Sequence, residues 1–533
     1  MARKFAGHLS SYDRVGGICC TVLLCLLVSL IAIALPQSGS QFSAHAAASA
    51  GTAQVTVNTA QSAGKLTDIS RGLNTAVWDG NLLDSAAAKA IKNTNVQVLR
   101  YPGGSTSDVY HWQSNNTVPN QGYANPANTF DAFMKVVQKT GTQPVITANY
   151  GSGTPEEAAA WVQYANKGGH GYNGPVPTYS GASTSGHRYG VKYWEIGNEL
   201  YGNGTYGATW EYDTHAMGPA TYASNVVAYS QAMKAVDAGI HVGAVLTAPG
   251  NWPDGQVSAS SPQPWNDTVL PAVCPSVDFV VAHWYPQGPG AETDAGLLSS
   301  TSQIASMTAT LRAQINQYCG SRASHIQIMV TETNSVSYNP GKQTVGLVNA
   351  LFLADNYMSW LENGVANVDW WDLHNSASGG NNNSAALYGD AQDGDYGVLS
   401  NGTCISATSN ICEPAANTPF PAYYGLQMLS KLGRPGDTMV SASSNQSLVA
   451  VHAVKQRGGK LAILLINKDP ANSYTVSLAF NGYHVSKHAT IYTYGQQSSA
   501  ITSQSGSASS VTLAPYSLTT VVLHSGDDDA STH

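Results

Sequence analysis

Hydrophobic and polar residues follow two different patterns along the chain. Between residues 65 and 433, short apolar runs alternate with stretches whose apolar residues recur with the helical period. This alternation is typical of βα units around a parallel sheet. We find eight such units, with strands expected to end near Asn74, Arg100, Asn149, Glu199, Thr247, His283, Glu332 and Asp372. The pattern predicts an α/β fold, a (β/α)8 TIM barrel over residues 65–433.

The helices of this region carry their own signals. In Thr154-Pro155-Glu156-Glu157, Thr154 is expected to cap a helix, Pro155 to occupy its first turn and Glu157 to complete a capping box. Further helices are expected over Thr221–Ala238, Gln343–Leu361 and Pro421–Leu432.

After Arg434 the helical period ends and apolar and polar residues alternate. The alternation predicts strands over Leu448–Val454, Lys460–Leu465, Tyr474–Phe480, Thr490–Tyr494 and Ser517–Leu523. We expect residues 434–524 to form an antiparallel β-sandwich, which residues 47–64 join through the Gln54–Val57 run. The remaining residues, 525–533, contain an acidic run without apolar partners and are expected to be disordered.

The first 46 residues contain the three parts of an export signal in the usual order. Arg3, Lys4 and Arg14 precede an apolar run from Ile18 to Leu35, and small-residue sites such as Ala44-His45-Ala46 follow it. We therefore predict a signal peptide over residues 1–46 and secretion, with no membrane attachment after its removal. A signal-anchor is the alternative, because the run approaches the ~18–20 residues that span a bilayer.

Charge and cysteine content narrow the class of protein. The chain has 24 Lys and Arg against 32 Asp and Glu, and no basic run, which excludes a nucleic-acid partner. Three of the seven cysteines lie in the predicted signal, which leaves Cys274, Cys319, Cys404 and Cys412. Three pairings are possible, and we favour Cys404–Cys412 with Cys274–Cys319. No cysteine spacing matches a zinc site.

Two glutamates end apolar strands in the predicted barrel. Glu199 is the next-to-last residue of the run Tyr193–Leu200, and Glu332 is the last residue of the run Ile326–Glu332. On our count these are the fourth and seventh strands, whose carboxyl ends open on the catalytic face of a TIM barrel. A retaining glycoside hydrolase needs one carboxyl to protonate the leaving oxygen and another to attack the sugar. We assign these roles to Glu199 and Glu332, respectively. Glu195 shares its parity with Glu199, and we expect a buried, paired structural acid there.

The motifs around these glutamates resemble those of clan A glycoside hydrolases. Trp194–Glu199 looks like the Asn-Glu motif of their fourth strand, and Val330–Asn334 like the nucleophile motif of their seventh. Arg100-Tyr101-Pro102-Gly103-Gly104, with Tyr101 where the pattern has Trp, resembles the second strand of family fifty-one α-L-arabinofuranosidases. Asn149-Tyr150-Gly151 resembles the end of their third strand, and the appended sandwich also fits their family thirty-nine relatives.

The resemblance and the chemistry together indicate supporting residues. Asn198 would bind the sugar hydroxyl next to the reacting carbon, and Arg100 would hold Glu332 ionised, although a structural ion pair is its alternative. Burial without such a partner would raise the pKa of Glu199. Either His283 or Tyr285 would orient Glu332, with a packed core histidine as the alternative for His283. Trp371 would stack on a sugar, ahead of Trp370 and of the weaker candidates Trp78, Trp112 and Trp252. Asn149 is a further candidate for the site.

These features predict a secreted retaining hydrolase of a plant or microbial polysaccharide or oligosaccharide, with an α-L-arabinofuranosidase as first choice. Other clan A activities are alternatives: β-xylosidase, endo-β-glucanase, xylanase or β-glucuronidase. A carbohydrate-binding protein without turnover is the rival from another class. We expect no cofactor and no metal, since Asp390, Asp393 and Asp395 lack the EF-hand spacing and are better explained as a solvated loop. The oligomeric state is left open.

Overall fold

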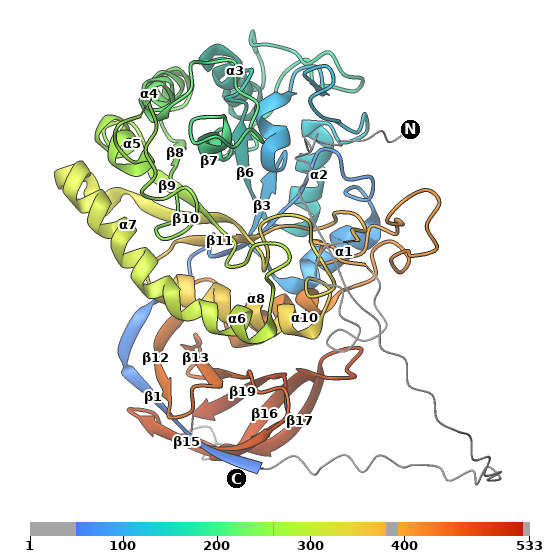
Figure 1. The fold of residues 1–533 in the computed structure, drawn as a ribbon, viewed down its shortest axis with the longest axis vertical. Helices are drawn as coiled ribbons and strands as arrows, with labels where there is room; N and C mark the ends of the chain where they lie inside the picture. Colours follow the sequence, from blue (N-terminus) through green and yellow to red (C-terminus); the bar gives the residue numbers. More distant parts are fainter. Residues whose placement is uncertain (1–49, 260, 380–392, 526–533) are drawn as a thin grey trace, which may run out of the picture. The chain divides into compact units, whose positions relative to one another are not determined.

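A closed barrel of eight parallel strands forms the larger part of the computed structural model (Figure 1). The structure describes residues 50–259, 261–379 and 393–525. The spatial order is β10-β11-β2-β3-β6-β7-β8-β9. In chain order the strands are β2 (Arg71–Asn74), β3 (Val98–Tyr101), β6 (Gln143–Ala148), β7 (Tyr193–Ile196), β8 (His241–Val245), β9 (Phe279–Trp284), β10 (Gln327–Thr333) and β11 (Asn367–Trp370). The predicted barrel is confirmed.

Helices lie outside this ring of strands (Figure 1). They are α1 (Ser85–Thr94), α2 (Phe130–Thr140), α3 (Pro155–Asn166), α4 (Pro219–Val236), α5 (Trp265–Val273), α6 (Asp294–Ser300), α7 (Ile304–Cys319), α8 (Leu347–Glu362) and α10 (Pro421–Leu432). Thr154 caps α3 as predicted, since its Oγ1 accepts from the Glu157 amide at 3.1 Å. The predicted capping box is wrong, because the Glu157 carboxylate binds Nδ1 of His111 instead, at 3.1 and 3.2 Å.

The interior of the barrel has two layers, which follow from the alternation of side chains along each strand. Near the start of the strands, an apolar cluster closes the barrel: Ile69, Val98, Val145, Tyr193, Phe279, Val281 and Met329. Two residues further along the strands, the same inward parity brings polar residues together: Arg100, Thr147, Glu195, His283 and Thr331. All five are buried. The barrel therefore has an apolar plug beneath a polar layer, and the polar layer opens toward the carboxyl ends of the strands.

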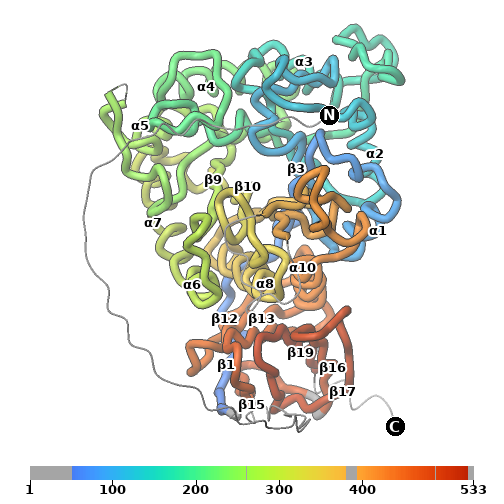
Figure 2. Tube along the Cα trace, turned by 45° about the vertical axis from the view of Figure 1, so that its right-hand side comes forward, coloured from blue at the N-terminus to red at the C-terminus, as the bar shows by residue number. Residues whose placement is uncertain are grey.

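A second sheet has nine strands in the order β17-β16-β19-β14-β13-β12-β1-β15-β18. They are β1 (Ala50–Lys65), β12 (Thr438–Ser444), β13 (Val449–Lys455), β14 (Leu461–Asn467), β15 (Ser473–Asn481), β16 (Val485–Gly495), β17 (Thr502–Ser507), β18 (Ser510–Leu513) and β19 (Ser517–Ser525). The N-terminal strand joins it as predicted, and Figure 2 shows blue β1 among orange and red strands.

The second sheet is not wholly antiparallel, so that part of the prediction is wrong. β1 pairs antiparallel with β12 but parallel with β15. Because β1 precedes the whole barrel in the sequence, no hairpin turn fixes its direction relative to β15. The mostly antiparallel sheet packs against the barrel through α8 and α10, which contact β13 and β19.

Charged side chains meet where α8 packs against the second sheet. Asp355 on α8 contacts Nε2 of His452 on β13 at 2.9 Å and Nζ of Lys468 at 2.6 Å. The other ring nitrogen of His452 lies 3.0 Å from Glu362. Burial lowers the pKa of His452, but the carboxylates of Glu362 and Asp355 outweigh burial and raise it to about 10. Protonated His452 thus joins the two parts of the molecule.

We expect His452→Ala to destabilise the fold by about 3 kcal/mol, the usual cost of removing one partner of a buried ion pair. The contribution of His452 is fully present below its unfolded pKa of about 6.5 and is lost as pH rises through about 10, because the folded state holds the proton more tightly. Thermal unfolding at pH 6 and pH 10.5 would measure this. The difference from the wild type should be large at pH 6 and shrink at pH 10.5, whereas exposed His325→Ala should change neither.

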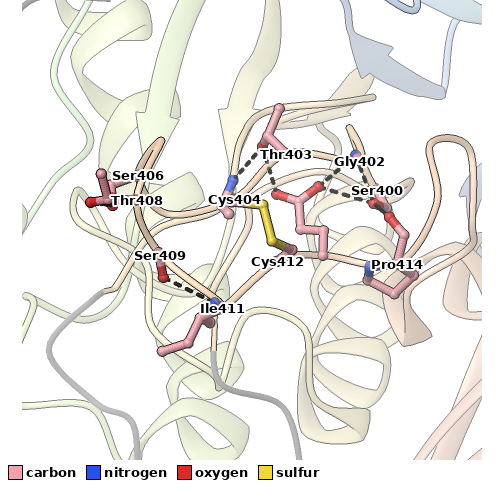
Figure 3. Close-up of a disulfide and its surroundings, with 12 residues drawn as sticks. Ser400, Gly402, Thr403, Cys404, Ser406, Thr408, Ser409, Ile411, Cys412 and Pro414 are labelled. Carbon is pink, nitrogen blue, oxygen red and sulfur yellow. Dashed lines mark hydrogen bonds between the residues drawn. A yellow bond between two sulfur atoms is a disulfide. The ribbon is translucent and has the colours of Figure 1, made fainter.

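Both predicted disulfides are confirmed. Cys274–Cys319 joins the end of α5 to the end of α7, and Cys404–Cys412 closes a short loop (Figure 3). Beside the second bridge, Glu413 accepts from the Ser400 hydroxyl at 3.0 Å and from the Gly402 amide at 2.9 Å. The loop is therefore held both covalently and by a buried carboxylate.

Several predictions concern residues that the structure does not describe. The signal peptide over residues 1–46, its signal-anchor alternative and Asp390 all lie outside the described ranges. Of the predicted disordered tail over residues 525–533, Ser525 instead ends β19, and residues 526–533 also lie outside the described ranges. Within those ranges, no helix combines the length and the apolar character of a membrane span.

Candidate active site

A cavity of about 820 Å³ opens at the carboxyl ends of the barrel strands. Seven of the residues that the sequence indicates line it: Asn198, Glu199, His283, Tyr285, Glu332, Trp371 and the weaker candidate Trp252. The remaining lining residues come from loops that follow the strands: Gly104, Ser105, Tyr201, Trp210, Asn251, Pro286, Gln287, Gly288, Ser337, Tyr338 and Tyr396. The cavity therefore lies where the sequence predicts the active site.

Glu332 projects from β10, the seventh strand, and has a fixed carboxylate. Nη1 of Arg100 donates to its Oε1 at 2.7 Å, and the hydroxyl of Tyr285 donates to its Oε2 at 2.9 Å. Only 5% of Glu332 is exposed. The predicted contacts of Arg100 and Tyr285 with this glutamate are thus present.

Arg100 connects the polar layer to the cavity. Its Nε donates to Glu195 at 2.7 Å, and its Nη2 donates to Oδ1 of Asn198 at 2.8 Å. Glu195 also accepts from the hydroxyls of Thr147 and Thr331, which makes it the buried structural acid that its parity predicted. Burial lowers the pKa of Arg100, but Glu195 and Glu332 outweigh burial and raise it, so the guanidinium remains charged. Arg100 therefore serves both as a structural ion pair and as a partner of Glu332.

Glu199 follows β7, the fourth strand, on a strained turn. Gly197 has a φ of 73° and Glu199 a φ of 22°, a region that residues with a side chain rarely adopt. Buried Asp108 holds this turn, because its Oδ2 accepts from the Asn198 amide at 2.8 Å while its Oδ1 accepts from the Gly151 amide at 3.1 Å. Asp108 is a site residue that the sequence did not indicate, since it belongs to no recognisable motif.

The carboxylate of Glu199 lies between an imidazole and an indole. His283 Nδ1 is 2.9 Å from its Oε1, and Trp210 Nε1 donates to its Oε2 at 3.0 Å. Burial raises the pKa of Glu199, but the contacts with His283, Tyr201 and Trp210 outweigh burial and lower it. Burial lowers the pKa of His283, and the carboxylates of Glu332 and Glu199 outweigh that effect and raise it.

One expectation is corrected by this arrangement, and another is met by one of its two candidates. We expected a raised pKa for Glu199, and the pKa is lowered instead. We expected His283 or Tyr285 from the sixth strand to contact Glu332, and Tyr285 does so. His283 instead lies closer to Glu199, with its Nδ1 3.5 Å from Glu332. The position along the chain accounts for this, because His283 lies within β9 and points into the barrel between the two acids, whereas Tyr285, of the same parity but beyond the end of the strand, reaches Glu332.

The three titratable groups are close together across the cavity. One ligand atom from each of Glu199, His283 and Glu332 lies within 4.8 Å of the other two. Such a group could hold a cation, or it could supply an acid and a nucleophile on either side of a sugar carbon. A second bond fixes the histidine, since its Nε2 lies 3.0 Å from the hydroxyl of Thr331.

Aromatic rings surround this centre. Trp371 lies against Gly104, where a Cβ would stand 2.7 Å from the ring, so only glycine permits this approach. Trp370, which the sequence made a less favoured candidate for sugar stacking than Trp371, is fully buried beside Phe352. The prediction that Trp112 could stack on a sugar is wrong, because its ring stacks on Trp161 in the core, with ring centroids 5.7 Å apart. Trp78 is half-buried and does not line the cavity.

Three other residues that the sequence singled out, Asn149, Asp393 and Asp395, do not line the cavity. Asn149 organises the turn after β6, where its Oδ1 accepts from the Ser152 and Gly153 amides at 3.0 and 3.1 Å. Asp393 and Asp395 are buried, so the expected solvated loop is wrong for them. Burial and the neighbouring carboxylate of Glu413 raise the pKa of Asp395 well above its ordinary value.

Comparison with curated proteins finds relatives for part of the chain. No family model matches. The chain is 32% identical over 169 residues to a probable α-L-arabinofuranosidase C of Aspergillus fumigatus, covering 30% of this chain and 31% of that protein. It is 33% identical over 129 residues to an intracellular exo-α-L-arabinofuranosidase of Bacteroides ovatus, covering 22% of this chain and 24% of the relative. The chain thus matches about a third of the length of its first curated relatives.

Solved structures match the fold over most of the chain. An α-L-arabinofuranosidase from Thermotoga maritima has a TM-score of 0.66 at 19% identity and covers 88% of this chain and 99% of that structure. A family 44 xyloglucanase from Paenibacillus polymyxa has a TM-score of 0.63 at 14% identity, with 89% and 100% covered. These likenesses show that the chain shares the fold of these enzymes, and over about a third of its length its sequence is similar to curated α-L-arabinofuranosidases.

Proposed function

We propose that this protein is a retaining glycoside hydrolase, with Glu332 as nucleophile and Glu199 as general acid and base. The observation that carries the proposal is the pair of carboxylates from the fourth and seventh strands. One oxygen of Glu199 and one oxygen of Glu332 lie within 4.8 Å of each other across the cavity. Retaining enzymes hold their two carboxyl groups about 5–5.5 Å apart, whereas inverting enzymes need about 6.5–9.5 Å to admit a water. The short separation favours retention.

In the first step the Oε2 or Oε1 atom of Glu332 attacks the anomeric carbon, and the bond to the leaving oxygen breaks. Arg100 and Tyr285 hold Glu332 in place and favour its ionised form, because both donate to its carboxylate. The leaving oxygen takes a proton from Glu199. His283 Nδ1 lies 2.9 Å from Glu199 and shares that proton with the carboxylate. The His283–Glu199 pair therefore holds the proton that the leaving oxygen takes. In the second step Glu199 takes a proton from water, which displaces Glu332.

An α-L-arabinofuranoside is the substrate that we favour. The support comes from the curated relatives, whose names specify this activity and whose sequences match up to about a third of the chain. An endo-acting β-glucanase is the second candidate. It is favoured by the exposed aromatic residues at the mouth of the cavity, Trp210 at 45%, Trp252 at 39% and Tyr338 at 67%, which suit a polymer.

The rings of Trp210 and Trp252 form an angled aromatic platform, with centroids 4.9 Å apart and planes at 53°, and Trp210 contacts Glu199. Because Glu199 must face the leaving oxygen, this platform adjoins the leaving group. We expect Trp252→Ala to lower kcat/KM on an oligosaccharide about 10-fold through a loss of stacking. The rate on the corresponding glycosyl fluoride, which has no leaving sugar, should stay within about two-fold. Equal losses on both substrates would contradict the assignment of the platform to the leaving group.

Two further features belong to this proposal. The second sheet is a β-sandwich, because one apolar cluster contains side chains from both of its ends, including Leu478 and Val511 at one end and Ile491 and Val521 at the other. The protein is secreted and acts on polysaccharide or oligosaccharide outside the cell, as its predicted export signal and its disulfides support.

Hydrolysis of a panel of 4-nitrophenyl glycosides tests the proposed function. The panel contains α-L-arabinofuranoside, β-D-xyloside, β-D-glucoside, β-D-cellobioside and β-D-glucuronide. We expect the α-L-arabinofuranoside to be hydrolysed at least about ten times faster than the others. Binding of oligosaccharides without release of reducing sugar from any substrate would instead favour the carbohydrate-binding rival.

A further inference from the structure

A third carboxyl group, that of Glu211, lies behind the wall of the cavity. Glu211 belongs to the segment between β7 and α4, and its amide donates to the Gly202 carbonyl at 3.2 Å. Only 5% of the residue is exposed. The proposed mechanism does not use it, although it contacts two residues of the cavity wall, Ser105 and Asn198.

The two oxygens of Glu211 have different surroundings. Oε1 accepts from the Ser105 hydroxyl at 2.6 Å and from Nδ2 of Asn198 at 2.8 Å. Oε2 is buried, and no hydrogen-bond partner for it occurs among the described residues. A buried carboxylate with a bare oxygen is far more costly than a neutral acid, in which only a hydroxyl lacks its acceptor. The contacts therefore suit an acid with its carbonyl at Oε1 and its proton at Oε2.

The burial of Glu211 and the charges that face it also favour its neutral form. Burial is the largest effect and raises its pKa well above the ordinary value, and the carboxylates of Asp108 and Glu199 raise it further. The hydrogen bonds from Ser105 and Asn198 oppose this rise but do not outweigh it. The phenol of Tyr201 also faces Glu211. Burial raises the pKa of this phenol well above the ordinary value, so it stays neutral and brings no charge that would stabilise an ionised Glu211. The cation of Arg100 reaches Glu211 only through the amide of Asn198.

We propose that Glu211 is a neutral positioning residue that fixes the amide of Asn198 for the sugar. This inference rests on the proposed function. Asn198 is held at three points: Asp108 accepts from its backbone N–H, Arg100 donates to its Oδ1, and Glu211 accepts from its Nδ2. An amide nitrogen has two hydrogens, so the second remains available to a sugar hydroxyl at the cavity. Without Glu211, the amide would lose the contact that directs this hydrogen.

The kinetic test compares Glu211→Gln with Glu211→Ala on the 4-nitrophenyl glycoside that the wild type hydrolyses best. Glutamine keeps the acceptor oxygen and replaces the acid hydroxyl by a neutral amide. We expect it to retain kcat within about three-fold near pH 6, whereas alanine should lower kcat about 10- to 100-fold with little change in KM, because the sugar contact strengthens in the transition state. Exposed Glu156→Gln is the matched control and should leave kcat and KM unchanged. Equal losses in the Gln and Ala variants would overturn the proposal.

A second measurement does not depend on activity. If Glu211 stays neutral in the folded state, the folded protein holds a proton that the unfolded chain releases above about pH 4.5, so the wild type loses stability as pH rises from there. Glu211→Gln has no such proton. Its melting temperature should exceed that of the wild type by a margin that widens between pH 4.5 and pH 8. A constant margin would mean that Glu211 is ionised and would overturn its neutrality, even if the wild type hydrolyses no glycoside. Failure of the whole panel with a widening margin would instead reject the proposed function alone.

Discussion

Changing Glu332 to Gln should lower kcat on the preferred 4-nitrophenyl glycoside at least about 10⁴-fold. Glutamine has nearly the same shape, but its amide cannot attack the anomeric carbon. Among the described residues, Glu199 is the one other carboxylate that lines the cavity, and it stands on the leaving-group side in the proposed mechanism. A good leaving group cannot rescue this variant, because the nucleophile is missing from the first step.

The control for Glu332→Gln is its fold. Arg100 keeps its bond to Glu195 at 2.7 Å when the charge of Glu332 is removed, so the barrel should remain intact. Thermal unfolding and circular dichroism should therefore match those of the wild type within a few degrees. Turnover within about ten-fold of the wild type in a folded variant would remove Glu332 from the mechanism.

Changing Glu199 to Ala should separate the two steps. A 4-nitrophenyl leaving group needs little protonation, so formation of the glycosyl-enzyme should be nearly spared, while its hydrolysis loses the base and slows about 10²- to 10⁴-fold. The intermediate should accumulate, and a burst of nitrophenol should precede a slow steady state. An unactivated oligosaccharide, which needs the acid, should be hydrolysed far more slowly still.

Azide provides the control for Glu199→Ala, because it attacks the glycosyl-enzyme without a general base. It should raise the steady-state rate of this variant about 10-fold or more and yield a glycosyl azide with the anomeric configuration of the substrate. Azide should not rescue Glu332→Gln. If azide has no effect on Glu199→Ala and no glycosyl azide forms, Glu199 is not the acid and base.

The sequence predicted those parts of the structure that depend on local patterns. The barrel follows from alternating helical and strand periods, and each predicted strand end lies within three residues of an observed one. Parity along the fourth strand correctly predicted that Glu195 is buried. Strand β17 has the sequence Thr-Ser-Gln-Ser-Gly-Ser and was missed, because an edge strand with almost no buried side chain has no apolar pattern.

The contacts of the site could be predicted only in part, because they join residues far apart in the sequence. The Asn-Glu motif identifies Glu199, but its lowered pKa depends on His283, 84 residues away, and on Trp210 in a loop. Nothing local to either residue fixes that geometry. Glu211 and Asp108 likewise follow no motif, and only their burial beside Asn198 reveals them. The sequence thus indicates the two carboxylates that we propose as reacting groups, whereas the structure defines how they are held.

The anomeric configuration of the first product tests the central claim most directly. Proton NMR within the first minutes of hydrolysis, before the free sugar mutarotates, distinguishes the two anomers by their anomeric signals. With oxygens of Glu199 and Glu332 within 4.8 Å, we predict direct attack by Glu332 and therefore a first product with the configuration of the substrate. A first product of inverted configuration would mean that water attacks the sugar directly, and it would contradict the proposed mechanism.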